Sequence, residues 1–165
     1  MNGQKWLIGF VLTLFALLVV ASRPVAARAS RVECTGTEVR TADLDPGVWT
    51  FPGGNIHVRG MVSQYQEESD CPQLAGVNVA AMNANWNANF VGPMWGTALL
   101  ETDYGDGGTW QGRWNGALSA DGQCSYQAVM HGVSGSVTGM KVFLNADCTA
   151  VPSPWTATLL DPAAD

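Results

Sequence analysis

The side chains of this sequence that are best suited to bind a ligand lie on one alternating stretch. From Asn55 to Tyr65, residues alternate with period two, which is typical of a β-strand with two distinct faces. His57, Arg59 and Tyr65 fall on one face, together with Met61. If that face lines the interior of a barrel, it forms a polar cluster that could bind a small anion or a carbonyl group. The simpler alternative is an outward strand face in contact with water.

Tryptophans form a second candidate binding group. Six of the seven tryptophans lie after residue 29. Trp110 and Trp114 are four residues apart, so on a strand they share one face. Filling the core of a small barrel is the simpler role for them. Exposed rings beside amide side chains would instead suit stacking on sugar rings, which makes a carbohydrate the alternative ligand.

A row of asparagines could provide such amides. Asn occupies each odd position from 83 to 89, whereas Ala84, Trp86 and Ala88 take even positions. Period two predicts a strand with one apolar face and one amide face. We expect the three apolar residues to point into the core and the asparagines to point outward.

Catalytic and metal-binding patterns are weak. Ser134 precedes a glycine that comes one residue too early for a nucleophile elbow. Asp103 and Asp106 lie in a glycine-rich segment that lacks the third acidic ligand of a calcium site, so a hairpin turn is expected. Glu67, Glu68 and Asp70 are expected to form a solvated acidic loop. We therefore expect no catalytic residue, no metal ligand and no cofactor.

The first 29 residues predict export. A basic start is followed by the sixteen-residue run 6–21, apolar or small except for Thr13, and then by Ala27-Arg28-Ala29, the layout of a cleaved signal peptide. This run is shorter than the ~20 residues of a membrane-spanning helix, so no stable span is expected after cleavage. Loss of Lys5, Arg23 and Arg28 changes the formal net charge from −6 to −9. Nucleic acids and anionic membranes are therefore poor partners, and the protein is expected to be secreted or extracytoplasmic.

Four cysteines in an exported chain predict two disulfides, for which three pairings are possible. If a hairpin pairs Gly132 with Met140, the same antiparallel register places Cys124 opposite Cys148. The Cα atoms of such a pair would be about 4.5 Å apart, within the range of disulfides. We therefore predict Cys124–Cys148, and Cys34–Cys71 by elimination.

Around these residues, glycine, asparagine and proline punctuate short runs rich in Trp, Val and Thr, which predicts an all-β domain. About seven or eight strands joined by hairpin turns fit a small antiparallel up-and-down barrel, with a β-sandwich as the alternative. Glycines recur inside the expected strands, which favours the barrel. We expect this domain to cover residues 30–150, followed by a loose Pro/Ala-rich tail over 151–165.

Three glycine-containing segments, 108–116, 131–135 and 139–141, together with Gly92-Pro93-Met94-Trp95-Gly96-Thr97, resemble exported bacterial proteins of the allene-oxide-cyclase and dirigent-like barrel type. The resemblance covers residues 55–149 and implies an eight-stranded barrel with a central cavity, but it assigns no catalytic residue. The expected function is binding of a small apolar ligand or a carbohydrate. The alternatives are a cyclase or isomerase that works by shaping its bound substrate, as the resemblance implies, and a structural protein of the envelope.

Overall fold

The structure is a computed structural model that describes residues 29–162, so the predicted signal peptide lies outside the described residues except for Ala29. The described chain is all-β, with nine strands and two short 3-10 turns. The strands are β1 (Ser30–Asp45), β2 (Val48–Thr50), β3 (Ile56–Ser69), β4 (Gly76–Trp86), β5 (Gly92–Thr102), β6 (Gly108–Leu118), β7 (Cys124–Gly135), β8 (Lys141–Asp147) and β9 (Ser153–Asp161). The turns are η1 (Pro52–Gly54) and η2 (Pro72–Leu74).

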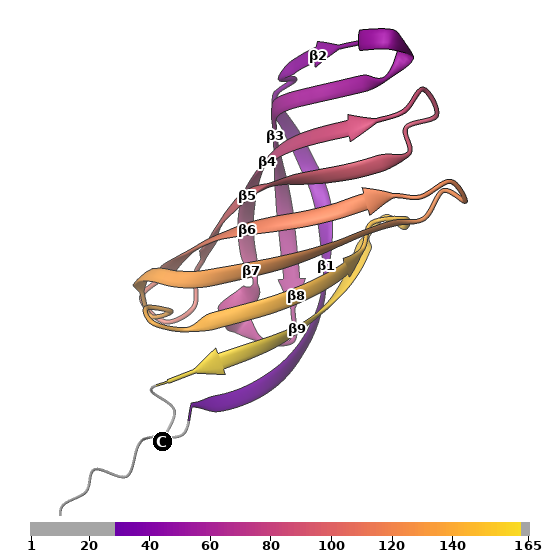
Figure 1. Cartoon of the computed structure of the whole chain (residues 1–165). Coiled ribbons are helices and arrows are strands. Elements are labelled where there is room, and N and C mark those ends of the chain that lie inside the picture. The colour runs from indigo at the N-terminus through magenta and orange to yellow at the C-terminus, as the bar shows by residue number, and fades with distance from the viewer. Residues whose placement is uncertain (1–28, 163–165) are drawn as a thin grey trace, which may run out of the picture.

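Eight of these strands close into a barrel (Figure 1). From β3 to β9 each strand pairs antiparallel with the next, and β1 pairs with both β9 and β3. The short strand β2 pairs only with β3 and extends the sheet beyond the ring. The predicted up-and-down antiparallel barrel is therefore confirmed, and the β-sandwich alternative is wrong.

Strand β9 closes the barrel, so the prediction of a loose tail over 151–165 is wrong for Ser153–Asp161. Strand β9 pairs with β8 on one side and with β1 on the other. Trp155, Ala157 and Leu159 alternate along it and are all buried. The prolines that suggested a tail lie before this strand, at its second residue or after it, positions that tolerate a missing N–H.

Both predicted disulfides are present. Cys124 and Cys148 lie opposite each other with Cα atoms 4.9 Å apart. Ser125 pairs with Asp147 and His131 with Lys141, which is the predicted hairpin register. The Cys34–Cys71 bridge, with Cα atoms 5.7 Å apart, ties β1 to the segment that follows β3.

Strand β6 shows how the interior is packed. Its inward face alternates glycine and tryptophan, so Trp110 and Trp114 both point into the barrel. A Cβ atom on Gly112 would lie 2.3 Å from the Val129 carbonyl oxygen and 2.4 Å from the Met130 side chain. One on Gly116 would lie 2.4 Å from the Ser125 carbonyl oxygen and 2.7 Å from the side chain of Tyr126. These glycines therefore make room for large side chains of the neighbouring strand, in keeping with the small–large alternation of small barrels.

A bulge in β3 changes which side chains face inward. The pairing of β3 with β4 shifts between Val58 and Met61, and Gly60 there has a φ of 68°, which glycine adopts without strain. Ile56 and Val58 point into the barrel before the bulge, and Met61, Ser63, Tyr65 and Glu67 line its interior after it. The prediction that His57, Arg59 and Tyr65 share one face is therefore wrong, because the bulge reverses the alternation between Arg59 and Met61.

Candidate ligand cavity

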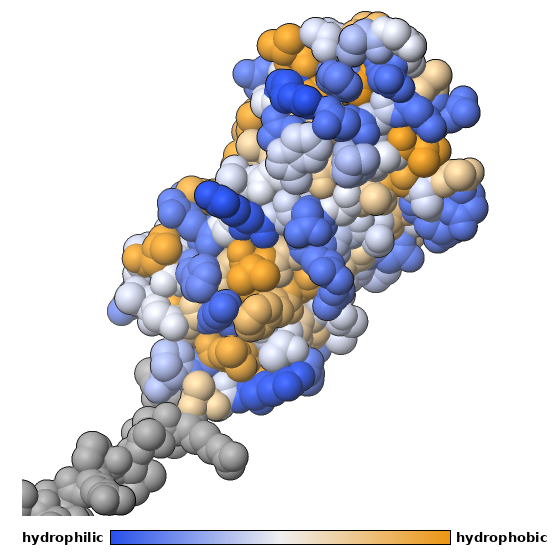
Figure 2. Space-filling model, viewed as in Figure 1, coloured by the Kyte–Doolittle hydropathy of each residue, from blue (hydrophilic) through white to orange (hydrophobic). Residues whose placement is uncertain are grey.

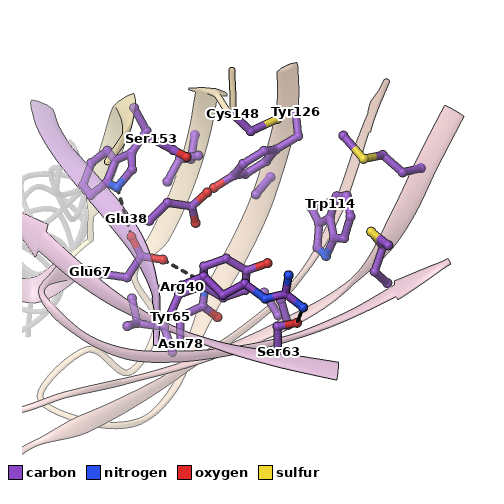
Figure 3. A pocket seen from close by; sticks show the side chains of 18 of the residues that line it. Glu38, Arg40, Ser63, Tyr65, Glu67, Asn78, Trp114, Tyr126, Cys148 and Ser153 are labelled. Atoms are coloured by element: carbon purple, nitrogen blue, oxygen red, sulfur yellow. Dashed lines mark hydrogen bonds between the residues drawn. The ribbon is translucent and has the colours of Figure 1, made fainter. Parts of the chain in front are cut away.

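The barrel encloses a cavity of about 370 Å³. Val151 belongs to its lining and is 83 % exposed, so the cavity reaches solvent at the turn between β8 and β9. Most of the wall is apolar and rich in methionine. The apolar lining includes Met61, Leu74, Ala80, Met82, Met94, Ala98, Leu100, Leu118, Ala128, Met130, Val142 and Leu144. The polar lining residues come mainly from β1, β3, β4 and β7 (Figure 3).

Two buried glutamates lie side by side in this wall. Glu38 on β1 and Glu67 on β3 are directly opposite in the antiparallel register, and they are 7 % and 6 % exposed. The two oxygens of Glu67 accept hydrogen bonds from Asn78 Nδ2 at 2.9 Å and from the Trp155 indole nitrogen at 3.0 Å (Figure 3). Burial raises the pKa of Glu67, and these two hydrogen bonds oppose the shift.

Glu38 is the more strongly perturbed acid. Burial and the nearby charge of Glu67 raise its pKa to about 7, and a hydrogen bond from the Tyr126 hydroxyl opposes the shift. Burial, followed by the charges of Glu38 and Glu67, also raises the pKa of Tyr126, so this phenol stays protonated. The cavity thus contains a carboxyl group that changes its charge near neutral pH.

Arg40 is the cation of the cavity lining, and it has partners within the protein. Its side chain is about half exposed, forms an ion pair with Asp43, and donates a hydrogen bond of 2.8 Å to Ser63 Oγ. Arg40 is thus paired with Asp43 and Ser63 rather than with either glutamate.

Three buried polar atoms of the cavity lining have no hydrogen-bond partner within residues 29–162. They are Asn78 Oδ1, Trp86 Nε1 and Trp114 Nε1. An unpaired buried donor or acceptor costs about 1–3 kcal/mol. Each of the three atoms is itself buried, so a molecule in the cavity would reach it only if the side chain moved.

An aromatic cluster borders the cavity on the side of β2. Trp86 lines the cavity, and its ring also packs against Trp49 at 6.3 Å and Phe90 at 5.8 Å between ring centroids. Trp49 and Phe90 are partly exposed, as is Phe51, which precedes η1. On the face shown in Figure 2, hydrophobic and hydrophilic residues are interspersed.

The structure brings only part of the predicted binding group together. Tyr65 and Trp114 line the cavity. Trp110 is fully buried beside it, where its indole nitrogen donates a 2.9 Å hydrogen bond to the Gln73 carbonyl. The predicted roles of His57 and Arg59 as cavity lining are wrong, because both lie on the outer side of β3.

Arg59 is held on the outer surface by neighbours on β3, β4 and β5. Its guanidinium donates hydrogen bonds of 2.7 Å to the carbonyls of Val58 and Ala84, and one of 2.6 Å to Asn85 Oδ1. It also lies 5.4 Å from the centroid of the Trp95 ring, a cation–π distance.

The asparagine row follows its predicted pattern only while the strand lasts. Ala84 and Trp86 are buried, whereas Asn85, Asn87 and Asn89 are exposed and Asn83 is half-buried. Ala88 is exposed, contrary to prediction, because β4 ends at Trp86. Beyond that point, Asn87 Oδ1 accepts hydrogen bonds from the backbone N–H groups of residues 89 and 91 and stabilises a turn.

Sequence reasoning missed Glu38, Glu67, Asn78 and Tyr126. The prediction that Glu67, Glu68 and Asp70 form a loop is wrong for the first two, because β3 continues to Ser69. Within the strand Glu67 points inward and Glu68 outward. The alternation that begins at Met61 would have placed Glu67 on the same face as Tyr65, if it had been followed past the acidic residues.

Cys34, Cys71 and Asp70 lie close enough together to resemble a metal site. The two sulfur atoms form a disulfide, and the Asp70 carboxylate accepts hydrogen bonds from the Thr35 N–H and hydroxyl. These contacts give the cluster a structural role that joins β1 to the end of β3.

Comparison of the chain with protein-family models, with curated proteins and with solved structures finds no match. The resemblance to allene-oxide-cyclase and dirigent-like barrels thus depends on the sequence motifs alone. No helix among residues 29–162 has the length and apolar composition needed to cross a bilayer. The two disulfides are typical of an oxidising compartment.

Proposed function

We propose that this protein is an exported binding module that holds a small, largely apolar molecule inside its barrel. The cavity is the observation that carries the proposal. Its volume of about 370 Å³ falls within the range of ligand pockets, and its wall combines apolar side chains with a few polar groups. The polar groups of the wall, among them Glu38 and Glu67, supply positions at which a ligand would gain hydrogen bonds.

The other binding alternative has less support. Trp110 and Trp114, the rings suggested for stacking on sugars, both point into the barrel rather than across its surface. A structural envelope role would favour a filled interior, whereas this interior is hollow. Export is supported by the signal-like N-terminal sequence and by the two disulfides.

Filling the cavity tests the proposal. Ala98 lines the cavity, and Thr97 is its exposed neighbour on the same strand, so Ala98→Phe and Thr97→Phe form a matched pair. N-phenyl-1-naphthylamine, a neutral apolar dye that fluoresces when removed from water, serves as the probe. We expect saturable binding to the mature protein, at least about tenfold weaker binding to Ala98→Phe, and unchanged binding to Thr97→Phe.

Thermal unfolding of each variant is measured in parallel. Equal dye affinity for a folded Ala98→Phe variant and the unmodified protein would show that the dye binds elsewhere. No saturable binding to the unmodified protein would overturn the binding module itself.

A second candidate is an isomerase that moves a proton within its bound substrate. It is favoured by the pKa of Glu38, about 7, because a general base works best when its pKa is near the operating pH. The Glu38 carboxylate would take a proton from a carbon beside a carbonyl group and return it to another carbon of the same molecule, so no co-reactant is needed. The Tyr126 hydroxyl, which donates to Glu38, would hold the carboxylate in place.

Mass spectrometry of a cavity-bound enone incubated in D₂O distinguishes this candidate. Deuterium incorporation by the unmodified protein that is lost in Glu38→Gln would support an isomerase. Binding without incorporation would leave the binding module.

A further inference from the structure

We propose that the cavity is selective for an apolar molecule with a protonated amine at one end, which binds between Glu38, Glu67 and Asn78. This inference rests on the proposed binding function and names the class of ligand for the same cavity. It reverses the expectation of an anionic ligand, which depended on Arg59 lying inside the barrel.

The first argument is the shortage of hydrogen-bond donors at this end of the cavity. Two carboxylate groups offer about eight acceptor positions between them. Glu67 receives two hydrogen bonds, Glu38 receives one from Tyr126, and Asn78 Oδ1 receives none. An ammonium group has up to three N–H donors and accepts no hydrogen bonds, so it supplies what these side chains lack.

The second argument is charge. Glu38 and Glu67 are directly opposite on adjacent strands, where like charges destabilise the pair. Arg40 lines the same cavity, but its guanidinium is paired with Asp43. A cation placed between the two carboxylates would remove their repulsion, whereas a bound anion would increase it.

The third argument is the rest of the wall. The rings of Trp114 and Tyr126 meet edge to face with centroids 5.8 Å apart, and both line the cavity. Aromatic faces attract ammonium groups, and the methionines offer an adaptable surface for an apolar chain.

Three molecules with the same chain test the headgroup directly. Decylamine, decanol and decanoate, each below its micelle concentration, compete with N-phenyl-1-naphthylamine for the mature, disulfide-bonded protein at pH 8. We expect decylamine to bind at least about tenfold more tightly than decanol, and decanoate to bind most weakly. Decyltrimethylammonium, which is cationic but has no N–H donor, is expected to lose part of that advantage.

Matched variants assign the effect to the buried acids. Glu38→Gln and Glu67→Gln should reduce the preference for decylamine over decanol, whereas Glu68→Gln removes the same charge from the outer face and should leave the preference unchanged. The preference for decylamine should also be smaller at pH 5 than at pH 8, because Glu38 is protonated at pH 5. The titratable or charged neighbours of Glu38 are Glu67, Tyr65, Tyr126 and Arg40.

The outcomes separate the two proposals. Equal affinities for the three molecules would overturn the amine preference and leave the apolar binding module in place. Tighter binding of decanoate than of decylamine would also overturn the amine preference, and it would indicate that Arg40 binds the headgroup. If none of the three displaces the dye, the amine preference fails while dye binding still supports the binding module. If the dye itself does not bind, both proposals fail.

Discussion

The two ends of the barrel interior are built differently. At the end that carries η2, Trp110, Leu159 and Val137 are fully buried, and the Cys34–Cys71 bridge and Leu74 pack among them. Beyond Leu74, which also lines the cavity, the same ring of strands encloses hollow space whose wall reaches Met82, Trp86 and Met94. One continuous sheet therefore supports both a packed core and a hollow site.

Side-chain size across neighbouring strands accounts for this difference. Asn78, Leu100 and Trp110 are adjacent on β4, β5 and β6, and large side chains meet there. The next inward row on the same three strands is Ala80, Ala98 and Gly112. Three small residues side by side widen the interior at this level, and the lining of the cavity extends from there to all eight strands of the ring.

The largest expected effect compares two tryptophans on one strand. Trp110→Ala should reduce the free energy of unfolding by about 3–5 kcal/mol, because it leaves a void in a packed core and removes the hydrogen bond to Gln73. Trp114→Ala should cost less than about 2 kcal/mol, because this ring already borders empty space and its indole nitrogen has no partner. Urea denaturation of both variants measures the difference.

If Trp110→Ala does not fold, Trp110→Phe provides a milder comparison at the same position. Equal losses at the two positions would mean that the cavity end is packed as tightly as the η2 end. That result would contradict the contrast between the two ends.

A smaller effect is expected from pH, and it arises from the buried glutamates of the cavity wall. The pKa of Glu38 is about 7 in the folded protein, against 4.5 for an ordinary glutamate. Between these pH values the folded state keeps a proton that the unfolded state has lost. The free energy of unfolding should therefore fall by at most about 3 kcal/mol as pH rises from 4.5 to 7. Above pH 7 it should stay constant.

Urea unfolding at pH 5 and pH 8 measures this slope. Glu67 contributes in the same direction, because burial raises its pKa as well. Glu38→Gln should remove most of the dependence, whereas Glu68→Gln on the outer face should preserve it. A slope that is unchanged in Glu38→Gln would show that another group titrates in this range.

Features encoded locally could be predicted from the sequence. The β7–β8 hairpin has a regular register, so the position of one residue pair fixed the Cys124–Cys148 bridge. The Gly–Trp alternation of β6 follows strict period two, and it placed Trp110 and Trp114 on one face. In a regularly paired strand, successive side chains point to opposite faces of the sheet without interruption. These predictions were confirmed for that reason.

The cavity could be predicted only in part, because the bulge near Gly60 depends on how β3 pairs with its neighbours rather than on composition. One extra residue there moved Arg59 out of the barrel and the Ser63–Tyr65–Glu67 series into it. Charge was also misleading, since a glutamate that is usually solvated becomes buried when Asn78 and Trp155 donate hydrogen bonds to it.

The smallest expected effect comes from Arg59, and it tests the position of that bulge. Arg59→Met removes three hydrogen bonds on the outer surface and a cation–π contact with Trp95, so it should cost only about 1 kcal/mol of stability. The affinity of the cavity for N-phenyl-1-naphthylamine should change by less than about twofold, because the guanidinium does not reach the cavity wall. A large loss of dye binding in a folded Arg59→Met variant would place Arg59 inside the barrel after all. The alternation of β3 would then run without a bulge, Met61 would share its inward face with Arg59, and the basic side chain would favour the anionic ligand over the amine.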